Sequence, residues 1–177
     1  MNNKNGLTLW LTGYSGSGKT SISYGISKKL AEMNIPFEIL DGDLIRESLS
    51  KGLGFSKEDR CENIKRIGFV AELLSRNGIF VIVSAISPFK SARQKVREKI
   101  KNFIEIYVNC SLEECEKRDP KGLYKKAKSG LINNFTGYDS LYEAPENPEI
   151  VCYTEKENLQ DSVNKIMTYL QRSNLIS

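Results

Sequence analysis

A glycine-rich octapeptide at positions 13–20, with the sequence GYSGSGKT, is the stretch of the chain with the most specific chemistry. It fits the pattern GxxxxGK[ST] and lies between a predicted strand and a predicted helix, which is the context of a phosphate-binding loop. Glycines let backbone N–H groups converge on a phosphate, and the positive end of the following helix strengthens the attraction. The pattern therefore predicts binding of a nucleoside triphosphate. The expected contacts are Gly13, Ser15, Gly16, Ser17, Gly18, Lys19 and Thr20.

Two side chains of this loop have distinct expected roles. Lys19 should reach the β- and γ-phosphates, and the hydroxyl of Thr20 should coordinate Mg²⁺. The acidic residue that usually follows the third strand of such proteins is missing, because the third predicted strand ends in Ser84. The sequence also has no NKxD-like guanine-specificity motif, so a GTPase is disfavoured.

Carboxylates follow the second predicted strand instead, at Asp41 and Asp43. A carboxylate pair facing a phosphate-binding loop favours a small-molecule kinase. One carboxylate would orient or deprotonate the acceptor hydroxyl, and the other would hold water on Mg²⁺. The alternative roles are structural: Asp43 could cap a helix that begins near Leu44, and Asp41 could end the strand in a turn. Lys19, Asp41 and Asp43 are therefore the first candidates for catalysis.

The sequence contains no histidine, and this absence narrows the chemistry further. Ser-His-Asp and Cys-His nucleophilic sites, imidazole-ligated zinc and a histidine general base are all excluded. Proton transfer must use a carboxylate, lysine, tyrosine, cysteine or water. A carboxylate base beside the phosphate-binding loop agrees with this restriction.

Apolar, β-rich runs alternate along the chain with stretches of helical spacing. This alternation predicts an α/β protein with the three-layer P-loop NTPase fold, in which helices cover both faces of a central parallel five-stranded sheet. Ligands bind such folds at the carboxyl ends of the strands. The predicted strands span 7–12, 37–40, 79–84, 103–108 and 150–154, and the predicted helices span 20–33, 57–76, 90–101, 112–118 and 159–170.

Residues 119–148 interrupt the alternation, because they are rich in Gly, Pro, Lys, Asn and Tyr and have no sustained apolar periodicity. A segment this long inside a compact domain is typically a functional lid or a disordered loop. Its aromatic residues, which include Phe135 and Tyr142, argue against disorder. We therefore expect residues 1–177 to form one domain with a lid at about 119–148.

The composition is that of a soluble globular protein, with 177 residues of which 40% are hydrophobic and 27% charged. The net charge of +4 is unevenly distributed, because the segments 90–101 and 117–128 each hold six basic side chains and one acidic side chain. Two short basic segments in an otherwise acidic chain favour a small polyanionic ligand over nucleic acid. Residues 90–101 are expected to form the solvated face of a helix.

The sequence also predicts the compartment. No apolar run approaches the roughly 20 residues of a membrane span, so no membrane association is expected. The cysteines form no CxxC pair and no signal-like stretch stands at the N-terminus, which together predict a reducing, cytoplasmic environment. The cysteines expected to be buried thiols are Cys61, Cys110, Cys115 and Cys152.

An ordered series of motifs over residues 7–151 resembles the adenylyl-sulfate kinase (APS kinase) family. The motifs are GYSGSGKT at 13–20, LDGD at 40–43 with Arg46, KGLGFSKEDRCENIKRIGFVA at 51–71, SAISPF at 84–89, CEKRDPKGLYKKAKSG at 115–130 and NNFTGYDSLYEAPENPE at 133–149. The resemblance implies an enzyme of sulfate assimilation. It would use ATP and Mg²⁺ to phosphorylate the ribose 3′-hydroxyl of adenosine 5′-phosphosulfate (APS), giving PAPS. Members are commonly dimers, so the resemblance also implies a possible homodimer.

For the acceptor, the resemblance implies three groups that contact the phosphosulfate nucleotide, namely Arg46, Arg60 and Asn63, with Asp43 also on the substrate side. Arginines suit this role because they form charge-assisted hydrogen bonds with anions. Phe55 and Phe135 match two aromatic residues that enclose the acceptor adenine. Without the resemblance, Phe55 would be interpreted as an ordinary core or loop residue.

The lid and the adjacent helix have implied roles as well. Lys121, Lys125 and Lys126 would neutralise phosphate charge and help exclude water when the lid closes. Arg118 matches a position beside the ATP adenine, although a cation at the C-terminus of a helix is its alternative role.

Ile86 and Ser87, in the turn after the third predicted strand, match a further acceptor contact. The serine at this position is also treated in the family as a possible phosphoserine intermediate, and Ser87 is therefore a fourth catalytic candidate. We expect it to form a substrate hydrogen bond instead. In-line transfer needs only positioning and electrostatics, and no histidine is present to activate the serine.

A few residues depart from the family pattern. Tyr14 and Ser17 occupy variable positions of the P-loop, whereas Leu44 and Ala85 lie near the acceptor and leave the identity of its base open. One alternative is therefore a 3′-hydroxyl kinase for another small nucleotide, such as a cytidine diphosphate derivative. An alternative of a different class is a catalytically idle nucleotide-binding regulatory module.

Overall fold

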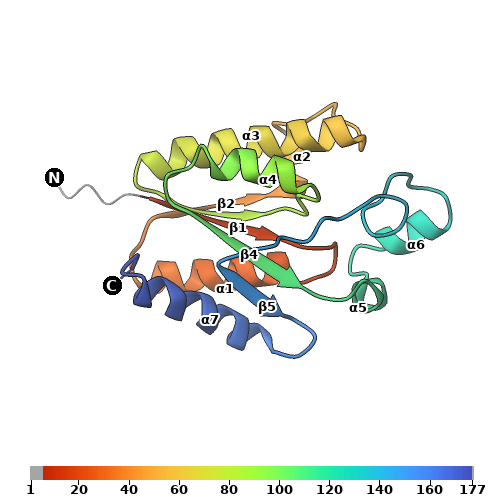
Figure 1. Cartoon of the computed structure of the whole chain (residues 1–177). Helices are drawn as coiled ribbons and strands as arrows, with labels where there is room; N and C mark the ends of the chain where they lie inside the picture. Colours follow the sequence, from red (N-terminus) through yellow and green to blue (C-terminus); the bar gives the residue numbers. More distant parts are fainter. Residues whose placement is uncertain (1–5, 177) are drawn as a thin grey trace.

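A five-stranded parallel sheet forms the centre of the structure, a computed structural model that describes residues 6–176 (Figure 1). The strand order is β2-β3-β1-β4-β5, and all neighbouring strands run parallel. The predicted α/β fold is thus confirmed, with strands at each predicted position. The strands are β1 (Leu7–Thr12), β2 (Phe37–Asp41), β3 (Phe80–Ser84), β4 (Phe103–Asn109) and β5 (Ile150–Tyr153).

Helices cover both faces of the sheet and extend beyond its carboxyl end. At two helix starts the local sequence explains the boundary: Ser56 accepts a hydrogen bond from the backbone N–H of Asp59, and Asn158 and Asp161 form a capping box. The helices are α1 (Lys19–Glu32), α2 (Gly42–Glu47), α3 (Lys57–Arg76), α4 (Lys90–Arg97), α5 (Leu112–Arg118), α6 (Leu123–Lys128) and α7 (Leu159–Arg172). Within residues 6–176, no helix combines the length and apolar character needed to cross a membrane.

The core consists of two apolar layers, one on each face of the sheet. Leu9 and Leu11 of β1 pack in the layer of α1 and α7, and Trp10 packs in the layer of α3 and α4. All three side chains are fully buried. Figure 1 shows these helix pairs on opposite sides of the sheet. A parallel sheet requires this arrangement, because both of its faces are apolar.

The strand order brings the candidate residues to one edge of the sheet. Asp41 at the end of β2 pairs in register with Ser84 at the end of β3. Ser84 in turn pairs with Leu11 of β1, the strand that leads into the P-loop. Ile39 and Ile82, two residues earlier in β2 and β3, lie in or against the α1 layer. Because side chains alternate along a strand, Asp41 and Ser84 face α1 as well.

The predicted helix at 90–101 is shorter than expected and is not simply a solvated face. Helix α4 ends at Arg97, and Ile100 in the following turn is buried against the sheet. Arg93 is only 3% exposed, so the expectation of a solvent-facing basic helix is wrong for this residue. The periodicity did not reveal it, because an arginine with buried partners looks like a surface arginine in the sequence.

Two further expectations need correction. The segment 119–148 contains a helix, α6, whose residues Tyr124 and Ala127 are buried in a small cluster with Phe135. A six-residue helix with two inward residues is too short to give a periodic signal. Among the cysteines, Cys110, Cys115 and Cys152 are buried as predicted, whereas Cys61 is partly exposed.

Candidate active site

The P-loop connects β1 to α1 and depends on glycine for its shape. Gly16 has a φ of 75° and Gly18, the N-cap of α1, has a φ of 103°, conformations that other residues rarely adopt. A Cβ atom at Gly16 would also lie 3.0 Å from the carbonyl oxygen of Cys115. The loop can therefore bring its backbone close to a phosphate at the start of α1.

Most of the predicted phosphate-loop residues line one cavity. Lys19 is nearly buried, and its Nζ donates hydrogen bonds to the carbonyl oxygens of Gly13 at 3.0 Å and Tyr14 at 2.7 Å. Gly13 and Ser17 lie behind the lining, and Ser17 is fully buried. The predicted loop residues that line the cavity are Ser15, Gly16, Gly18, Lys19 and Thr20.

Burial lowers the pKa of Lys19 to about 8. A triphosphate binds the protonated ammonium best, so its affinity should fall once Lys19 loses its proton. We expect the dissociation constant of a non-hydrolysable ATP analogue to rise by roughly tenfold per pH unit above about pH 8. Calorimetry between about pH 7 and pH 9.5 would measure this, with Lys19→Met as the control that should bind weakly and lose the pH dependence. The same pH dependence in Lys19→Met would contradict this role.

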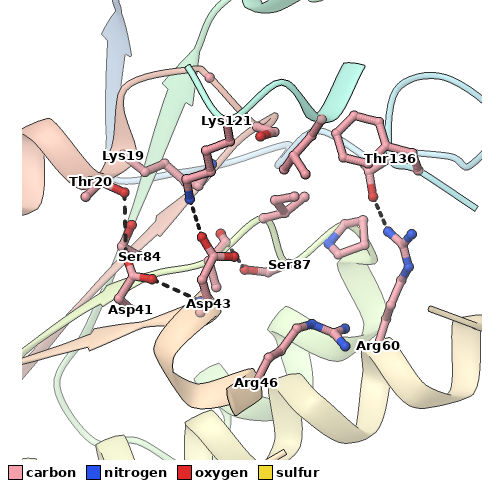
Figure 2. Close-up of a pocket in the computed structure, with 18 of the residues that line it drawn as sticks. Lys19, Thr20, Asp41, Asp43, Arg46, Arg60, Ser84, Ser87, Lys121 and Thr136 are labelled. Carbon is pink, nitrogen blue, oxygen red and sulfur yellow. Dashed lines mark hydrogen bonds and ion pairs between the residues drawn. The ribbon is translucent and has the colours of Figure 1, made fainter. Parts of the chain in front are cut away.

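Asp41 has a structural contact and a contact towards the P-loop at the same time. Its Oδ1 accepts a hydrogen bond of 2.9 Å from the backbone N–H of Asp43, so it caps α2. Its Oδ2 lies 3.5 Å from the hydroxyl of Thr20, the residue expected to coordinate the metal (Figure 2). The sequence left open that Asp43 caps a helix and that Asp41 ends the strand in a turn. A helix cap is present, but Asp41 rather than Asp43 provides it. The cap also fixes the second oxygen of Asp41 beside Thr20.

Asp43 points across the cavity to the segment 119–148. Its Oδ2 forms an ion pair with Nζ of Lys121, which reaches down from that segment (Figure 2). Both side chains are at least half exposed, so this contact contributes little stability. The contact does show that Lys121 can reach the space next to Asp43. The two carboxylates thus face different partners, Asp41 the P-loop and Asp43 the segment 119–148.

The cavity has a volume of about 660 Å³, within the range of small-molecule sites. It extends from the P-loop past the carboxylates to the turn after β3, the start of α3 and the 119–148 segment. Of the predicted acceptor residues, it brings together Asp43, Arg46, Phe55, Arg60, Asn63, Ile86, Ser87, Lys121 and Phe135.

The two predicted stacking residues, Phe55 and Phe135, both line the cavity but differ in how far their side chains are exposed. Phe55 is 51% exposed, with the guanidinium of Arg46 at 4.6 Å from its ring centroid and that of Arg60 at 5.8 Å. Phe135 is nearly buried and meets the ring of Tyr124 edge-on at 4.9 Å. Phe55 is therefore not a core residue, and two cations lie close to its ring.

Arg60 and Asn63, on consecutive turns of α3, have different hydrogen-bonding states. The Nε of Arg60 donates to the carbonyl of Phe55 at 2.9 Å, and another nitrogen donates to Thr136 of the 119–148 segment (Figure 2). The third nitrogen donates to the carbonyl of Asn134 in the same segment. Among the residues that the structure describes, nothing hydrogen-bonds to the buried Oδ1 of Asn63. Asn63 thus offers a free acceptor in the cavity, whereas Arg60 joins α3 to the segment 119–148.

The hydroxyl of Ser87 is engaged by the protein itself. Its Oγ accepts a hydrogen bond of 2.9 Å from the indole N–H of Trp10 and donates one of 3.1 Å to the carbonyl of Ala85. Ser87 is 1% exposed and has a φ of +45°, a conformation that non-glycine residues rarely adopt. Its carbonyl accepts from Arg93 at 2.6 Å. These contacts indicate a serine that shapes its turn.

The remaining candidates divide into two groups. Arg118 lines the cavity and donates to the carbonyl of Thr154 at 2.7 Å, whereas Lys125 and Lys126 are exposed and do not line it. Ser84 and Thr136 lie within the quoted motifs and both line the cavity, but neither was among the predicted site residues. Ser84 could have been found from its position at the end of a strand beside Asp41, but Thr136 had no comparable signal.

The strand order, the P-loop and a cavity that holds both carboxylates define a P-loop kinase, an enzyme that transfers phosphate to a hydroxyl. The sequence model of one family, described as adenylylsulphate kinase, matches residues 5–153. The chain belongs to this family, and the resemblance seen in the motifs is confirmed. The prediction of an enzyme of the kinase class is confirmed with it.

Curated relatives match over almost the whole chain. An adenylyl-sulfate kinase of Picosynechococcus sp. is 56% identical over 165 residues, 93% of each chain. One of Rippkaea orientalis is 57% identical over 166 residues, 94% of this chain and 92% of the relative. Among solved structures, that of the Mycobacterium tuberculosis APS kinase in complex with AMPPNP and APS has a TM-score of 0.90 and 41% identity. The match covers 94% of this chain and 98% of the Mycobacterium tuberculosis chain.

Proposed function

We propose that the protein phosphorylates the ribose 3′-hydroxyl of adenosine 5′-phosphosulfate with MgATP, giving 3′-phosphoadenosine 5′-phosphosulfate in sulfate assimilation. One observation carries the proposal: a single cavity joins a phosphate-binding loop to a second end lined by Phe55, Arg46 and Asn63, with two carboxylates between them. Related proteins with adenylyl-sulfate kinase names, and a structural neighbour described with AMPPNP and APS, support the identity of the two nucleotides.

The residues near Thr20 fit a magnesium ion. Within residues 6–176, no group of three or more His, Cys, Asp or Glu side chains could enclose a metal. Thr20 and Asp41 supply two oxygens at the P-loop, and Ser84 adds a buried hydroxyl without a hydrogen-bond partner in the described part of the chain. Mg²⁺ prefers such sparse oxygen sites, which it completes with phosphate and water oxygens. When bound, it would neutralise charge on the transferring phosphate.

The geometry suggests separate roles for the two carboxylates. Asp41 faces Thr20, so it would orient water beside the metal position. Asp43 faces the acceptor end, where its carboxylate would accept the proton of the attacking hydroxyl. Lys19 from the P-loop and Lys121 from the lid would neutralise phosphate charge from two sides.

The lid, residues 119–148, would close over the two nucleotides and exclude water. The ion pair of Lys121 with Asp43 and the hydrogen bonds of Arg60 to Thr136 and Asn134 support this role, because they already join the lid to both sides of the cavity. Lys125 and Lys126 remain exposed, so their proposed part is limited to the electrostatic attraction of anionic ligands.

Transfer would be direct rather than through a phosphoserine on Ser87. The hydroxyl of Ser87 is held by Trp10 and the carbonyl of Ala85, and among the described residues no side-chain base hydrogen-bonds to it. Ile86 and Ser87 would instead form the wall against which the acceptor ribose lies. The ATP adenine would lie near Arg118, on the other side of the P-loop from this wall.

Assembly and location complete the proposal. We infer a homodimer from the family resemblance, and one related structure is described as a hexameric APS kinase from Thiobacillus denitrificans, with a TM-score of 0.75 and 30% identity. That chain is longer, since the match covers 99% of this chain and 30% of the other. A cytoplasmic location is supported by four free cysteines, three of them buried.

Replacing Phe55 with alanine should raise the KM for APS by roughly tenfold and leave the KM for ATP nearly unchanged. A base that stacks on an aromatic ring gains about 1–3 kcal/mol, and this ring is exposed to the cavity. Phe69, on the exposed surface of α3 and outside the cavity, provides the matched Phe→Ala control. Steady-state kinetics with each substrate varied would measure the difference. An unchanged KM for APS would remove Phe55 from the acceptor site.

The proposed acceptor is tested by comparing kcat/KM for APS with the values for other nucleotides. The panel should include a cytidine diphosphate derivative, because Leu44 and Ala85 depart from the family pattern near the acceptor, and Ala85 lines the cavity. We expect APS to be preferred by orders of magnitude. Preference for a cytidine nucleotide would establish the alternative 3′-hydroxyl kinase, and ATP binding without turnover of any acceptor would indicate an idle nucleotide-binding module.

A further inference from the structure

Arg93 is a buried cation that the motifs did not identify. It lies on α4, is 3% exposed and is paired with Glu105 of β4, whose Oε1 accepts from its Nε at 2.7 Å. Burying a charge is unfavourable unless it is paired and hydrogen-bonded, and Glu105 supplies the pairing. The pair leaves the two outer nitrogens of the guanidinium available for other partners.

Those two nitrogens join segments that are far apart in the sequence. Nη1 donates to the carbonyl of Ser87 at 2.6 Å, in the turn that lines the acceptor end of the cavity. Nη2 donates to the carbonyl of Glu143 at 2.8 Å, where the lid returns towards the sheet. One planar side chain thus fixes the acceptor turn and the end of the lid at a set separation.

Other contacts tie the same two segments together. The backbone N–H of Glu143 donates to the carbonyl of Pro88 at 2.8 Å. Next to it, the hydroxyl of Tyr142 lies 3.0 Å from that of Thr12, which donates to the carbonyl of Ile86 at 2.7 Å. The lid end is therefore attached to the acceptor turn over three consecutive turn residues, and Arg93 is the charged member of this junction.

The backbone conformation of Ser87 indicates why the acceptor turn depends on these contacts. With a φ of +45°, it adopts a conformation that a non-glycine residue keeps only when its surroundings hold it there. Trp10 holds its hydroxyl and Arg93 holds its carbonyl. Loss of either contact should let the turn relax, and the wall against which the acceptor lies would move with it.

We propose that Arg93 is a positioning residue for the acceptor nucleotide, which it aligns through the Ser87 turn and the Glu143 end of the lid without touching either nucleotide. This inference rests on the proposed function, because it assigns Arg93 to the acceptor half of the reaction. The hydrogen-bond partners of the Arg93 guanidinium are Glu105, Ser87 and Glu143, none of which belongs to the P-loop. Replacing Arg93 should therefore leave the binding of ATP nearly unchanged.

Arg97 provides a matched control on the same helix. Its guanidinium also reaches Glu105, at 3.4 Å, and forms a pair with Glu149 at 2.6 Å. In the described part of the chain, the Arg97 guanidinium forms no hydrogen bond with the Ser87 turn or with Glu143. An arginine that acts only through the charge network on α4 would therefore behave like Arg97, and one that positions the acceptor would not.

The test compares Arg93→Lys with Arg97→Lys. Both variants keep the positive charge and lose the planar fork. For Arg93→Lys we expect the KM for APS to rise about tenfold or more, because a small misplacement of a reactant has large kinetic effects. The KM for ATP and the affinity for an ATP analogue should change less than about twofold. For Arg97→Lys, all of these values should stay within about twofold of wild type.

Equal kinetics in the two variants, or a parallel rise in the KM for ATP, would overturn the proposal. If Arg93→Lys does not fold, Tyr142→Phe decides, because it removes only the hydroxyl that meets Thr12 and keeps the ring. A rise in the KM for APS of about threefold or more in that variant supports the junction, and an unchanged value overturns it. Wild-type protein that fails to turn over APS would instead refute the proposed function.

Discussion

Replacing Asp43 with asparagine should lower kcat for APS phosphorylation by about 10²–10⁴-fold, the usual contribution of a general base. Asparagine has nearly the same shape but cannot accept the proton of the attacking hydroxyl. Asp43 is the carboxylate that lines the proposed acceptor end of the cavity and forms an ion pair with Lys121 of the segment 119–148. The affinity for an ATP analogue should stay near the wild-type value, because within residues 6–176 the Asp43 side chain forms no hydrogen bond or ion pair with a P-loop residue. Single-turnover kinetics with saturating nucleotides would measure the loss.

A matched control for Asp43→Asn is Glu47→Gln, which removes a carboxylate from the exposed end of the same helix, outside the cavity. This control should keep kcat within about twofold of wild type. Near-normal turnover by Asp43→Asn would show that Asp43 is not the base. The proton would then have to be accepted by Asp41 or by the phosphate itself.

Replacing Asp41 with asparagine should have the second largest effect, a loss of about 10²-fold in kcat together with a weaker dependence on Mg²⁺. Groups that orient the ligands of a metal contribute effects of this size. Asparagine is as good a helix N-cap as aspartate, so the hydrogen bond from the backbone N–H of Asp43 can persist. The loss would then report the missing negative charge beside Thr20. Titration of activity and of ATP-analogue binding with Mg²⁺ would measure both effects.

Asp41→Ala separates the cap from the charge. It should lose catalysis to at least the same extent and also destabilise the protein by about 1 kcal/mol, because α2 loses its N-cap. Thermal unfolding of the two variants gives the difference. If Asp41→Asn keeps the Mg²⁺ dependence and kcat of the wild type, then Asp41 serves only as the cap of α2.

The elements that carry the chemistry could be predicted because they have strong local signals. The P-loop follows from the order of its glycines, Lys19 and Thr20, and the position of Asp41 follows from the end of an apolar strand. An alternating pattern of strands and helices then requires a parallel sheet, which places these residues at one edge. The function classes that need histidine were excluded by composition alone.

The parts that could not be predicted depend on contacts between distant segments. Arg60 was expected to bind the acceptor. Its hydrogen bonds to Thr136 and Asn134 across the cavity could not be predicted, because no local sequence pattern indicates contacts between segments so far apart. Arg93 was expected on a solvated helix face, because the helical periodicity does not show that Glu105 of β4 lies close enough to pair with it. The burial of Phe135 against Tyr124 likewise follows from the packing of α6, a helix too short to be detected.

The most direct test of the account is the structure of the product formed by the purified protein from MgATP and APS. Mass spectrometry and phosphorus NMR would identify the new phosphate and the ribose carbon that carries it. We predict PAPS, with the phosphate on the 3′-oxygen and no phosphorylated protein formed when APS is absent. A phosphate at another position, no product from APS, or a protein phosphorylated on Ser87 that passes its phosphate to APS would contradict direct transfer in the cavity between the P-loop and Phe55.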